Sequence, residues 1–311
     1  MDQQFLAGLR RPRDLAEESV IEVSVVIPVY NGAATLQAAL RSLMTQTLGR
    51  ERYEVIVVDD GSRDDSAAIA RSCGARTIVQ SNAGAPAART TGIREARGEW
   101  IAFTDADCVA SRGWLAALLA AAKRESGCIG AAGKTIGFRS QAPAARFVDL
   151  MGGLDAGRYL QHPRFPFAPT ANALYRREYL LEAGGFDERY ATYDACDLHA
   201  RIARRFAGAF PYEPRALIMH KHRESWRAYW RQQFFYGVGY AQFVLAHRDE
   251  IRWNVRLQLR ALADVVAKGF RAGIPAVGDA AILRRGELVR AAAQQAGFIR
   301  AYYSAKERRR W

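Results

Sequence analysis

The feature that most restricts the fold of this chain is a regular alternation of short apolar runs and helical patterns in its first 107 residues. The apolar runs VSVVIPVY, YEVIVVDD, RTIVQS and EWIAFTDAD are separated by helix-like segments through ATLQAALRSLMTQ, DDSAAIARSCG and APAARTTGIREA. Strands that take turns with helices predict a mostly parallel sheet covered by helices on both faces. The expected fold class is therefore α/β.

Short polar clusters follow four of these predicted strands. A parallel sheet binds its ligands in the crevice beyond the carboxyl ends of its strands, so we expect the clusters to share one edge. They are residues 30–32 (YNG), 59–62 (DDGS), 82–89 (NAGAPAAR) and the pair Asp105 and Asp107 in TDADC. Two carboxylates at the end of a buried run need compensation from protein cations or from a bound metal ion. The competing interpretation is a solvated or helix-capping loop, and the coincidence of four clusters counts against it.

Composition and charge restrict the class of protein further. Half of the 311 residues are hydrophobic, as in a globular chain with a sizeable core. Four widely spaced cysteines form no CxxC pair, which argues against a zinc ribbon or a disulfide framework and favours reduced thiols. Residues 1–200 hold 23 Lys and Arg against 24 Asp and Glu, whereas residues 201–311 hold 22 against 8. The basic character of the last third points to phosphate-rich partners.

Three regions are expected along the chain. Residues 1–20 are typical of a poorly ordered lead-in, residues 21–222 form the α/β domain, and residues 223–311 form a helical region rich in basic and aromatic side chains. No signal-peptide pattern is visible, and the longest apolar segment, WLAALLAAA, is far shorter than the roughly 20 residues of a membrane span. We therefore expect a cytoplasmic protein, peripheral at the inner face of the plasma membrane.

Several segments in the right order resemble the family 2 glycosyltransferases, which have the GT-A fold. These segments are VSVVIPVYNGAATLQAALRSLMTQT, YEVIVVDDGSRDDS, SNAGAPAARTTGIREARGEWIAFTDADC and ALYRREYLLEAGGFDERY. The resemblance implies a GT-A domain over residues 21–222, with a Rossmann-like sheet flanked by helices. It also implies transfer of a sugar from a nucleotide diphosphate donor, with inversion at the anomeric carbon. UDP is the nucleotide that the family suggests.

The resemblance assigns residues to the nucleotide site. Pro28 and Tyr30 match residues that form the wall of the base pocket. Asp60 matches the carboxylate that hydrogen-bonds the base, and Asp59 beside it is expected to be structural. Arg89 matches an arginine at the nucleotide site. These roles are expectations from the family pattern, since residue spacing alone does not specify them.

The resemblance also implies a divalent cation, Mn²⁺ or Mg²⁺. Asp105 matches the first acid of the family's DxD motif, near the ribose and the metal, and Asp107 matches the second acid, which ligates the metal. A diphosphate leaving group gains negative charge as the glycosidic bond breaks. A hard cation with oxygen ligands can neutralise that charge, and an arginine can share the task.

Inversion requires a base that takes a proton from the acceptor hydroxyl, and here the chain departs from the family pattern. The family supplies the base from an ED.D motif after GGFDE, whereas this chain has GGFDERYATYDACDL. Ala195 replaces the aspartate that is commonly assigned as the base. Asp194 is the first candidate in its place and Asp197 the second. A structural role for Asp197 at the start of its helix remains open.

The segment IMHKH contains two further candidates. A histidine after this helix often completes the metal site in GT-A enzymes, and imidazole is a ligand for Mn²⁺. We therefore predict His220 as a metal ligand, with less support for His222. The alternative is an ordinary surface pair, and His199 is expected to pack or to face water.

An aromatic and basic helix is predicted at the start of the last region. SWRAYWRQQFFYGVGYAQFVL places Trp226, Trp230 and Phe234 on one helical stripe, with arginines at the same spacing beside it. Such a helix can lie in the headgroup layer of an anionic membrane. Alternatively it packs on the α/β domain and closes the acceptor side. Nucleic acid is not an expected partner, because no recognisable binding motif accompanies the charge.

The expected function is transfer of one sugar to a lipid-linked or polysaccharide acceptor at the cytoplasmic membrane face. A polyprenyl-phosphate sugar transferase is an alternative within the family, and a processive synthase is disfavoured because no spanning helix or QxxRW-like motif is present. A Rossmann oxidoreductase would show GxGxxG after the first strand, where this chain has PVYNGAAT. A non-catalytic nucleotide-sugar-binding scaffold also remains open, because Ala195 stands at the usual base position.

Overall fold

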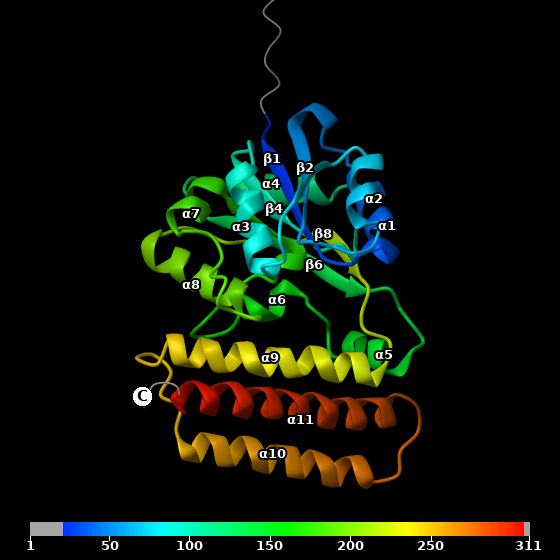
Figure 1. Ribbon diagram of the computed structural model, residues 1–311, viewed down its shortest axis with the longest axis vertical. Coiled ribbons are helices and arrows are strands. Elements are labelled where there is room, and N and C mark those ends of the chain that lie inside the picture. Colours follow the sequence, from blue (N-terminus) through cyan, green and yellow to red (C-terminus); the bar gives the residue numbers. More distant parts are fainter. Residues whose placement is uncertain (1–20, 308–311) are drawn as a thin grey trace, which may run out of the picture.

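A computed structural model describes residues 21–307, and the predicted lead-in at residues 1–20 lies outside this range. One eight-stranded sheet in the order β3-β2-β1-β4-β7-β6-β8-β5 forms the centre of the α/β domain (Figure 1). Helices cover both of its faces, as the alternation predicts. The α/β fold class with a helical carboxyl-terminal region is confirmed.

The first half of the sheet is parallel, and its strands are those that the apolar runs predict. The strands are β1 (Val23–Val29), β2 (Tyr53–Asp59), β3 (Arg76–Val79) and β4 (Trp100–Phe103). They alternate with α1 (Ala33–Leu43), α2 (Ser66–Ser72) and α3 (Ala85–Glu95), and a short 3₁₀ turn at Arg50–Arg52 precedes β2. Every residue of β1 and β2 is buried, because helices cover both faces of the strands. All the carboxyl ends of these strands therefore meet at one edge.

The second half of the sheet is mixed. Its strands are β5 (Cys108–Ala110), β6 (Gly130–Gly137), β7 (Ala173–Arg176) and β8 (Tyr212–His220). Strand β7 runs antiparallel to both β4 and β6, β6 is parallel to β8, and β5 pairs antiparallel with β8. The elements between them are α4 (Trp114–Ala122), α5 (Pro143–Leu150), α6 (Ala156–Tyr159), a 3₁₀ turn (Thr170–Asn172), α7 (Arg177–Glu182) and α8 (Asp194–Arg205). This half brings β8 next to β5, the short strand that follows Asp105 and Asp107 (the DAD segment).

Three long helices form the carboxyl-terminal region: α9 (Trp226–Ala246), α10 (Val255–Gly273) and α11 (Gly278–Glu307). In Figure 1, α9 lies nearest the α/β domain, α11 lies beside it and α10 lies farthest from the sheet. Glycines bring α9 and α11 into close contact. A Cβ atom at Gly237 would lie 2.0 Å from the carbonyl oxygen of Gln294, and one at Gly297 would lie 1.9 Å from that of Phe234.

The aromatic helix predicted for this region is α9, and it packs on the rest of the protein. Tyr229 and Phe243 are buried, and the ring of Phe243 contacts Tyr190 and Phe165 in the α/β domain. Arg227 and Arg231 are exposed. Of the two roles expected for this helix, packing on the α/β domain is therefore the arrangement found, and membrane contact stays a prediction.

Candidate active site

The loops after the parallel strands are tied together by their polar side chains. The backbone N–H of Asn31 donates to Ser62 Oγ at 2.9 Å, which joins the loop after β1 to the loop after β2. Asp60 is buried, and its carboxylate accepts hydrogen bonds from the backbone N–H groups of Ala83 and Gly84 at 2.9 and 2.8 Å. The loop after β3 is thereby held against the loop after β2.

The residues predicted for the base pocket lie at this edge. Pro28 is buried within β1, and Tyr30, just beyond the strand, is half exposed. Asp59 accepts the Ser62 N–H at 2.7 Å, which is the local structural role expected for it. Asp60 holds the neighbouring loop in addition to any contact with a base. The nucleotide-binding roles of Pro28, Tyr30 and Asp60 stay predictions.

The DAD segment forms the turn between β4 and β5. Cys108, the first residue of β5, pairs with His220, the last residue of β8. This register brings His220 Nε2 to 3.5 Å from Asp107 Oδ1. Potential ligand atoms of Asp105, Asp107, Cys108 and His220 all lie within 4.8 Å of one another. The sheet therefore brings the imidazole of His220 to two carboxylates that lie more than a hundred residues earlier in the chain.

The donor set of this cluster fits a hard divalent cation. Burial raises the pKa of Asp107 despite the opposing effect of His220, and Asp105 raises it further. Arg223 is the nearest guanidinium, with Nη1 at 3.9 Å from Asp107 Oδ2. A cation would supply the missing compensation, with carboxylate oxygens and an imidazole nitrogen as suitable ligands for Mn²⁺ or Mg²⁺.

Cys108 is the least suitable member of this cluster. Burial raises the pKa of its thiol well above the ordinary value, and Asp105 and Asp107 raise it further. Only the thiolate is an effective ligand, and a hard cation prefers oxygen. The useful ligands are therefore the two acids and the histidine.

Arg89 joins the DAD segment to the start of α8. Its Nη2 donates to Asp105 Oδ1 and its Nη1 donates to Asp194 Oδ2, both at 3.0 Å. The guanidinium is buried, and burial opposes its charge, but the two carboxylates hold its pKa above the ordinary value. Arg89 Nε has no hydrogen-bond partner within residues 21–307. The Arg89 guanidinium therefore partly neutralises two acids that the sequence assigned to different roles, Asp105 to the metal site and Asp194 to proton abstraction.

Asp194 is a largely buried carboxylate in the first turn of α8, with 13% of its side chain exposed. Burial raises its pKa even though Arg89 acts in the opposite direction. The preceding residue, Tyr193, has φ 70°, a left-handed conformation that costs a non-glycine residue about 1 kcal/mol or more. The Tyr193 ring packs against Tyr240 and Phe243 of α9. The carboxyl-terminal region therefore supports the turn that presents Asp194.

Asp197 lies in a separate network. Its carboxylate accepts from Arg201 Nε at 2.7 Å and lies 3.1 Å from His247 Nε2, and Tyr190 Oη donates to it at 3.3 Å. Burial acts to raise its pKa, but these partners hold the pKa below the ordinary value. The geometry matches the structural alternative that the sequence left open, because the network ties α8 to the end of α9. The catalytic role of Asp197 stays a prediction.

Of the two remaining histidines considered in the sequence, His222 contacts His220, whereas His199 packs in the core. His222 Nδ1 lies 3.0 Å from His220 Nδ1, and its Nε2 lies 3.2 Å from Asp149 Oδ1 on α5. Burial, followed by the neighbouring His220, lowers the pKa of His222 to about 4. His222 therefore helps to fix the orientation of the His220 ring. His199 is buried and hydrogen-bonded to the Tyr175 hydroxyl at 3.1 Å, in agreement with the expectation that it packs.

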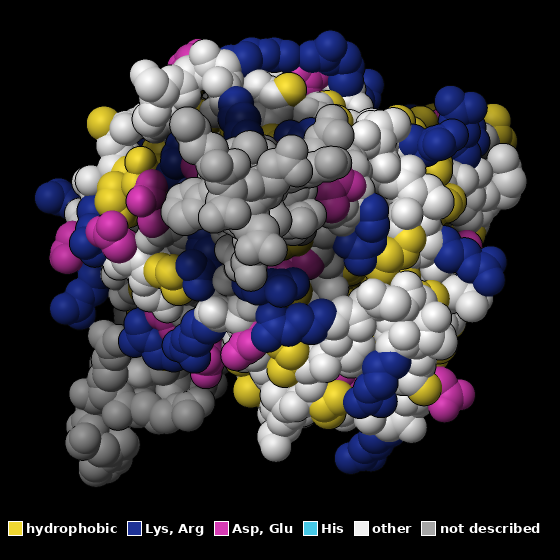
Figure 2. All heavy atoms as spheres, turned by 90° about the horizontal axis from the view of Figure 1, so that it is seen from above, with side chains coloured by type: hydrophobic (Ala, Val, Ile, Leu, Met, Phe, Trp, Pro, Cys, Tyr) yellow, Lys and Arg dark blue, Asp and Glu magenta, His cyan; other side chains and the backbone are white. Residues whose placement is uncertain are grey.

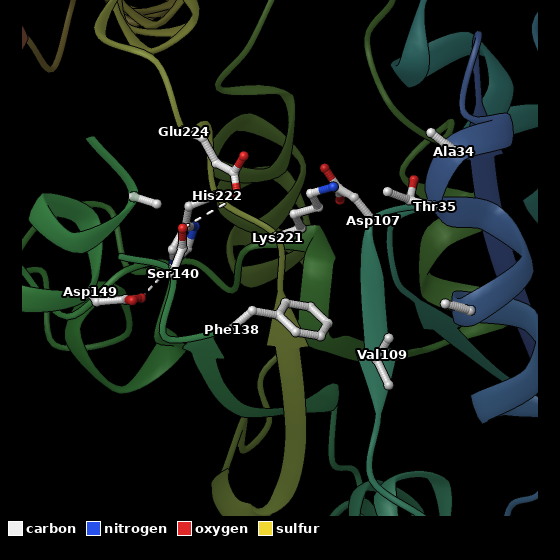
Figure 3. Close-up of a pocket in the computed structure, with 12 residues that line it drawn as sticks. Ala34, Thr35, Asp107, Val109, Phe138, Ser140, Asp149, Lys221, His222 and Glu224 are labelled. Carbon is white, nitrogen blue, oxygen red and sulfur yellow. Dashed lines mark hydrogen bonds and ion pairs between the residues drawn. The ribbon is translucent and has the colours of Figure 1, made fainter. Parts of the chain in front are cut away.

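Two cavities border the acid and histidine cluster. The larger has a volume of about 450 Å³ and contains Arg89, Asp105, Asp194 and His220 in its wall. Helices α6, α9 and α11 contribute its aromatic and amide lining, including Tyr159, Tyr229, Tyr236, Gln233 and Gln294. The smaller, of about 320 Å³, lies on the other side of Asp107 beside the start of α1, with Thr35 and Lys221 in its wall (Figure 3).

Several residues near the cluster carried no sequence signal. Lys221 lies between the two candidate histidines and lines the smaller cavity, but a lysine in a basic segment draws no attention by itself. Asp149 is one acid on an amphipathic helix, and only the fold brings it to His222. Of the tyrosines named for the larger cavity, Tyr159 lies on α6, whereas Tyr229 and Tyr236 lie on α9. Their shared location depends on long-range packing.

The model of the family described as "Glycosyl transferase family 2" matches residues 24–184, more than half of this chain. Among curated proteins, a "Pre-mycofactocin glycosyltransferase" of Mycobacterium tuberculosis is 32% identical over 253 residues, which cover 78% of this chain and 52% of that protein. "Glycosyltransferase AglE" of Haloferax volcanii is 41% identical over 99 residues, or 30% of this chain and 33% of that one. The chain thus spans about half of the first relative and a third of the second.

Solved structures share the fold at low sequence identity. The mannosyltransferase PcManGT from Pyrobaculum calidifontis, in complex with GDP-Man and Mn²⁺, has a TM-score of 0.65 and 20% identity, over 95% of this chain and 91% of that one. S. aureus TarS 1–349 in complex with UDP-GlcNAc has a TM-score of 0.53 and 18% identity, over 92% of each chain. Both matches extend beyond the α/β domain into the carboxyl-terminal region, because that region is much longer than the uncovered part of the chain.

Proposed function

We propose that this chain, which belongs to glycosyl transferase family 2, moves a sugar from a nucleotide diphosphate donor to a hydroxyl group of its acceptor, with inversion at the anomeric carbon. The observation that carries the proposal is the arrangement around Arg89. One guanidinium bridges the first acid of the DAD segment and the largely buried Asp194, and all three line the same cavity as His220. Donor-side and acceptor-side chemistry can therefore meet at one place.

The donor is proposed to bind at the edge where the loops after β1, β2 and β3 are tied together. Pro28, Tyr30 and Asp60 would contact the nucleotide, with Arg89 and Asp105 near the diphosphate. Structural neighbours are described as complexes with GDP-Man and with UDP-GlcNAc. We propose a UDP-sugar for this chain from the family pattern, with GDP-mannose as the comparison.

Asp105, Asp107 and His220 are proposed to hold a divalent cation, Mn²⁺ or Mg²⁺. When bound, the cation would offset the negative charge that the departing diphosphate gains. Arg89 would add a fixed positive charge from the protein, at a position held by its two carboxylate partners. These groups would act without rearrangement, because the surrounding loops already hold them in place.

Asp194 is proposed as the general base. Its carboxylate lines the larger cavity, and burial with a raised pKa makes it more basic than an exposed aspartate. That is the direction that favours proton abstraction from an acceptor hydroxyl near neutral pH. Arg89 would keep Asp194 ionised and oriented before the proton moves. Asp197, the other acid in this turn, is engaged with Arg201 and His247 instead.

The larger cavity is proposed to receive the acceptor, which we expect to be lipid-linked or a polysaccharide at the cytoplasmic membrane face. Tyr159 and Tyr236, which are partly exposed, line this cavity and could stack on a sugar ring. Within residues 21–307, no helix has the length and hydropathy of a membrane span. Contact with the membrane would therefore be peripheral as far as the described residues go.

A polyprenyl-phosphate acceptor is the second candidate, and two arginines favour it. Arg158 and Arg290 both line the larger cavity, and within the described part of the chain neither forms an ion pair with an acid. A phosphate group could bind there through charge-assisted hydrogen bonds. Substitution of Arg290 by Gln should weaken transfer to a polyprenyl phosphate but leave transfer to a neutral glycan hydroxyl unchanged if this candidate is correct.

The proposed function is tested first on donor binding and donor hydrolysis. A panel of UDP- and GDP-sugars with and without Mn²⁺ should raise the thermal unfolding midpoint, because a ligand that binds only the folded state stabilises it. The Asp107→Ala variant should lose the Mn²⁺-dependent shift and nucleotide release. Asp249→Ala, which removes an exposed acid distant from the cluster, should keep both. Absence of nucleotide release from the wild type with every donor would instead favour a nucleotide-sugar-binding scaffold.

A further inference from the structure

Helix α10 exposes a continuous apolar stripe. Five large side chains at spacings of three and four residues are 38–77% exposed: Val255, Leu259, Leu262, Val266 and Phe270. This spacing places them along one face of the helix. Ile274 and Val277, in the connection to α11, extend the apolar surface with exposures of 55% and 88%. An apolar surface of this extent on a globular protein usually marks a binding site.

The stripe is not the face that packs α10 onto the protein. Gln258 is buried and donates to Gln295 of α11 at 3.2 Å, so the packed side of α10 is the one that carries the glutamine. At 100° per residue, the centre of the apolar stripe lies roughly a quarter turn from that side. Figure 2 shows the opposite end of the molecule, where hydrophobic side chains are scattered among charged ones.

Positive charge borders the stripe. Arg256, Arg260 and Arg271 are exposed and lie on the adjacent strip of the helix. Within residues 21–307, none of these three arginines takes part in an ion pair. Asp264 is the only acid of α10, and it is paired with Lys268. The surface therefore combines aliphatic and aromatic groups with uncompensated guanidinium groups.

We infer that α10 is a membrane-surface helix that lies in the headgroup layer of an anionic bilayer, with the apolar stripe at the acyl boundary and the arginines on lipid phosphates. A basic helix with one apolar face has the pattern of interfacial helices, and guanidinium groups can reach headgroups while their stems cover apolar surface. A second copy of the chain is the less suitable occupant, because an antiparallel two-fold contact between α10 helices would bring the arginine strips of both copies together.

The inferred orientation also places the acceptor cavity near the membrane. Helix α11 lies between α10 and α9, and both α9 and α11 contribute to the cavity wall. Helix α11 therefore contacts α10 on one side and helps to form the cavity wall on another. A lipid-linked acceptor could reach the cavity with its lipid part still in the bilayer. This consequence depends on the proposed function, whereas the membrane contact itself does not.

Vesicle flotation tests the inference with the full chain. Wild-type protein should float with phosphatidylcholine vesicles that contain about 30 mol % phosphatidylglycerol, and less with phosphatidylcholine alone. The Leu259→Ser/Phe270→Ser variant keeps every charge and should lose at least about tenfold in partitioning. The Arg256→Gln/Arg260→Gln variant keeps the stripe and should lose about 25-fold, because each cation near an anionic surface contributes about 1 kcal/mol.

A matched control separates this surface from general electrostatic attraction. Arg227→Gln/Arg231→Gln removes the same charge from the exposed side of α9 and should leave flotation close to wild type. Equal losses in the two arginine variants would overturn the assignment to α10, as would a wild type that does not float. A wild-type dimer in sedimentation velocity that becomes monomeric in Leu259→Ser/Phe270→Ser would assign the stripe to a second copy. Donor-induced thermal shifts in each variant report the folded state and the transferase proposal independently of vesicle binding.

Discussion

Replacement of Asp194 by Asn removes the proposed base with the smallest change of shape. The asparagine keeps a carbonyl oxygen that can accept from Arg89 Nη1, which now lies 3.0 Å from Asp194 Oδ2. It loses the negative charge and the ability to take a proton. Loss of a general base costs about 10²–10⁴-fold in rate, which corresponds to about 3–5 kcal/mol at 1.36 kcal/mol per factor of ten. We expect a decrease in transfer within that range.

The stability change should be much smaller than the change in rate. Breaking a buried ion pair outright costs about 3–5 kcal/mol because a charge is left without compensation. Arg89 retains Asp105 at 3.0 Å and a neutral acceptor at residue 194. We therefore expect a loss of no more than about 1–2 kcal/mol in the free energy of unfolding, because the weaker hydrogen bond to Arg89 is offset in part by removal of a buried negative charge.

Three measurements on the same variant separate these effects. Rapid-mixing single-turnover experiments give the rate of transfer, titration gives donor affinity, and urea unfolding gives stability. Donor affinity should change by less than about threefold, since Asp105 and Asp107 are intact. Asp187→Asn is the matched control, because it removes a partly exposed carboxylate that is paired with Arg189 in the same segment. A wild-type rate in Asp194→Asn would refute the role of this residue, and equal decreases in both variants would attribute the effect to the segment.

Asp197→Asn should lower the free energy of unfolding by about 3 kcal/mol at neutral pH with donor affinity unchanged in the folded protein, because it disrupts a buried pair. Because the folded pKa of Asp197 is lowered, the stability that its ionised carboxylate contributes is present above its ordinary pKa and is lost as the pH falls through the folded pKa. In urea unfolding, the stabilities of the wild type and of Asp197→Asn should therefore converge below about pH 4. A stability difference that is constant with pH would contradict this expectation. Gly237→Ala should lower the free energy of unfolding by about 1–3 kcal/mol, and with it the melting temperature, because the new Cβ would clash with Gln294. The control Gly273→Ala should be neutral or slightly stabilising, because a Cβ there would have no atom within 4 Å. Removal of divalent cations by a chelator should weaken donor binding in calorimetry and be reversed by Mn²⁺, and a donor affinity that EDTA leaves unchanged would rule out the metal at Asp107.

Local pattern made the parallel half of the sheet predictable. A run such as VSVVIPVY is apolar on both sides and has the length of a strand, and the helical segments between such runs allow only crossover connections. Parallel strands place their carboxyl ends together, so the convergence of the YNG, DDGS and DAD loops also follows from the sequence. The antiparallel position of β7 between β4 and β6 did not follow, because pairing direction depends on contacts between distant segments.

Residue types and their order were enough to indicate the family and a set of candidate site residues in this protein. Only the tertiary structure decided which of them meet. The pairing of β5 with β8 brings His220 to Asp107, and the docking of α8 brings Asp194, rather than Asp197, to Arg89. The amphipathic pattern of α10 could be read from the sequence, but its exposure depends on α11 occupying a different side of the helix. The physical reason is the same in each case: periodicity is a local property of the chain, whereas the partner of a charged or apolar side chain is determined by packing across long sequence separations.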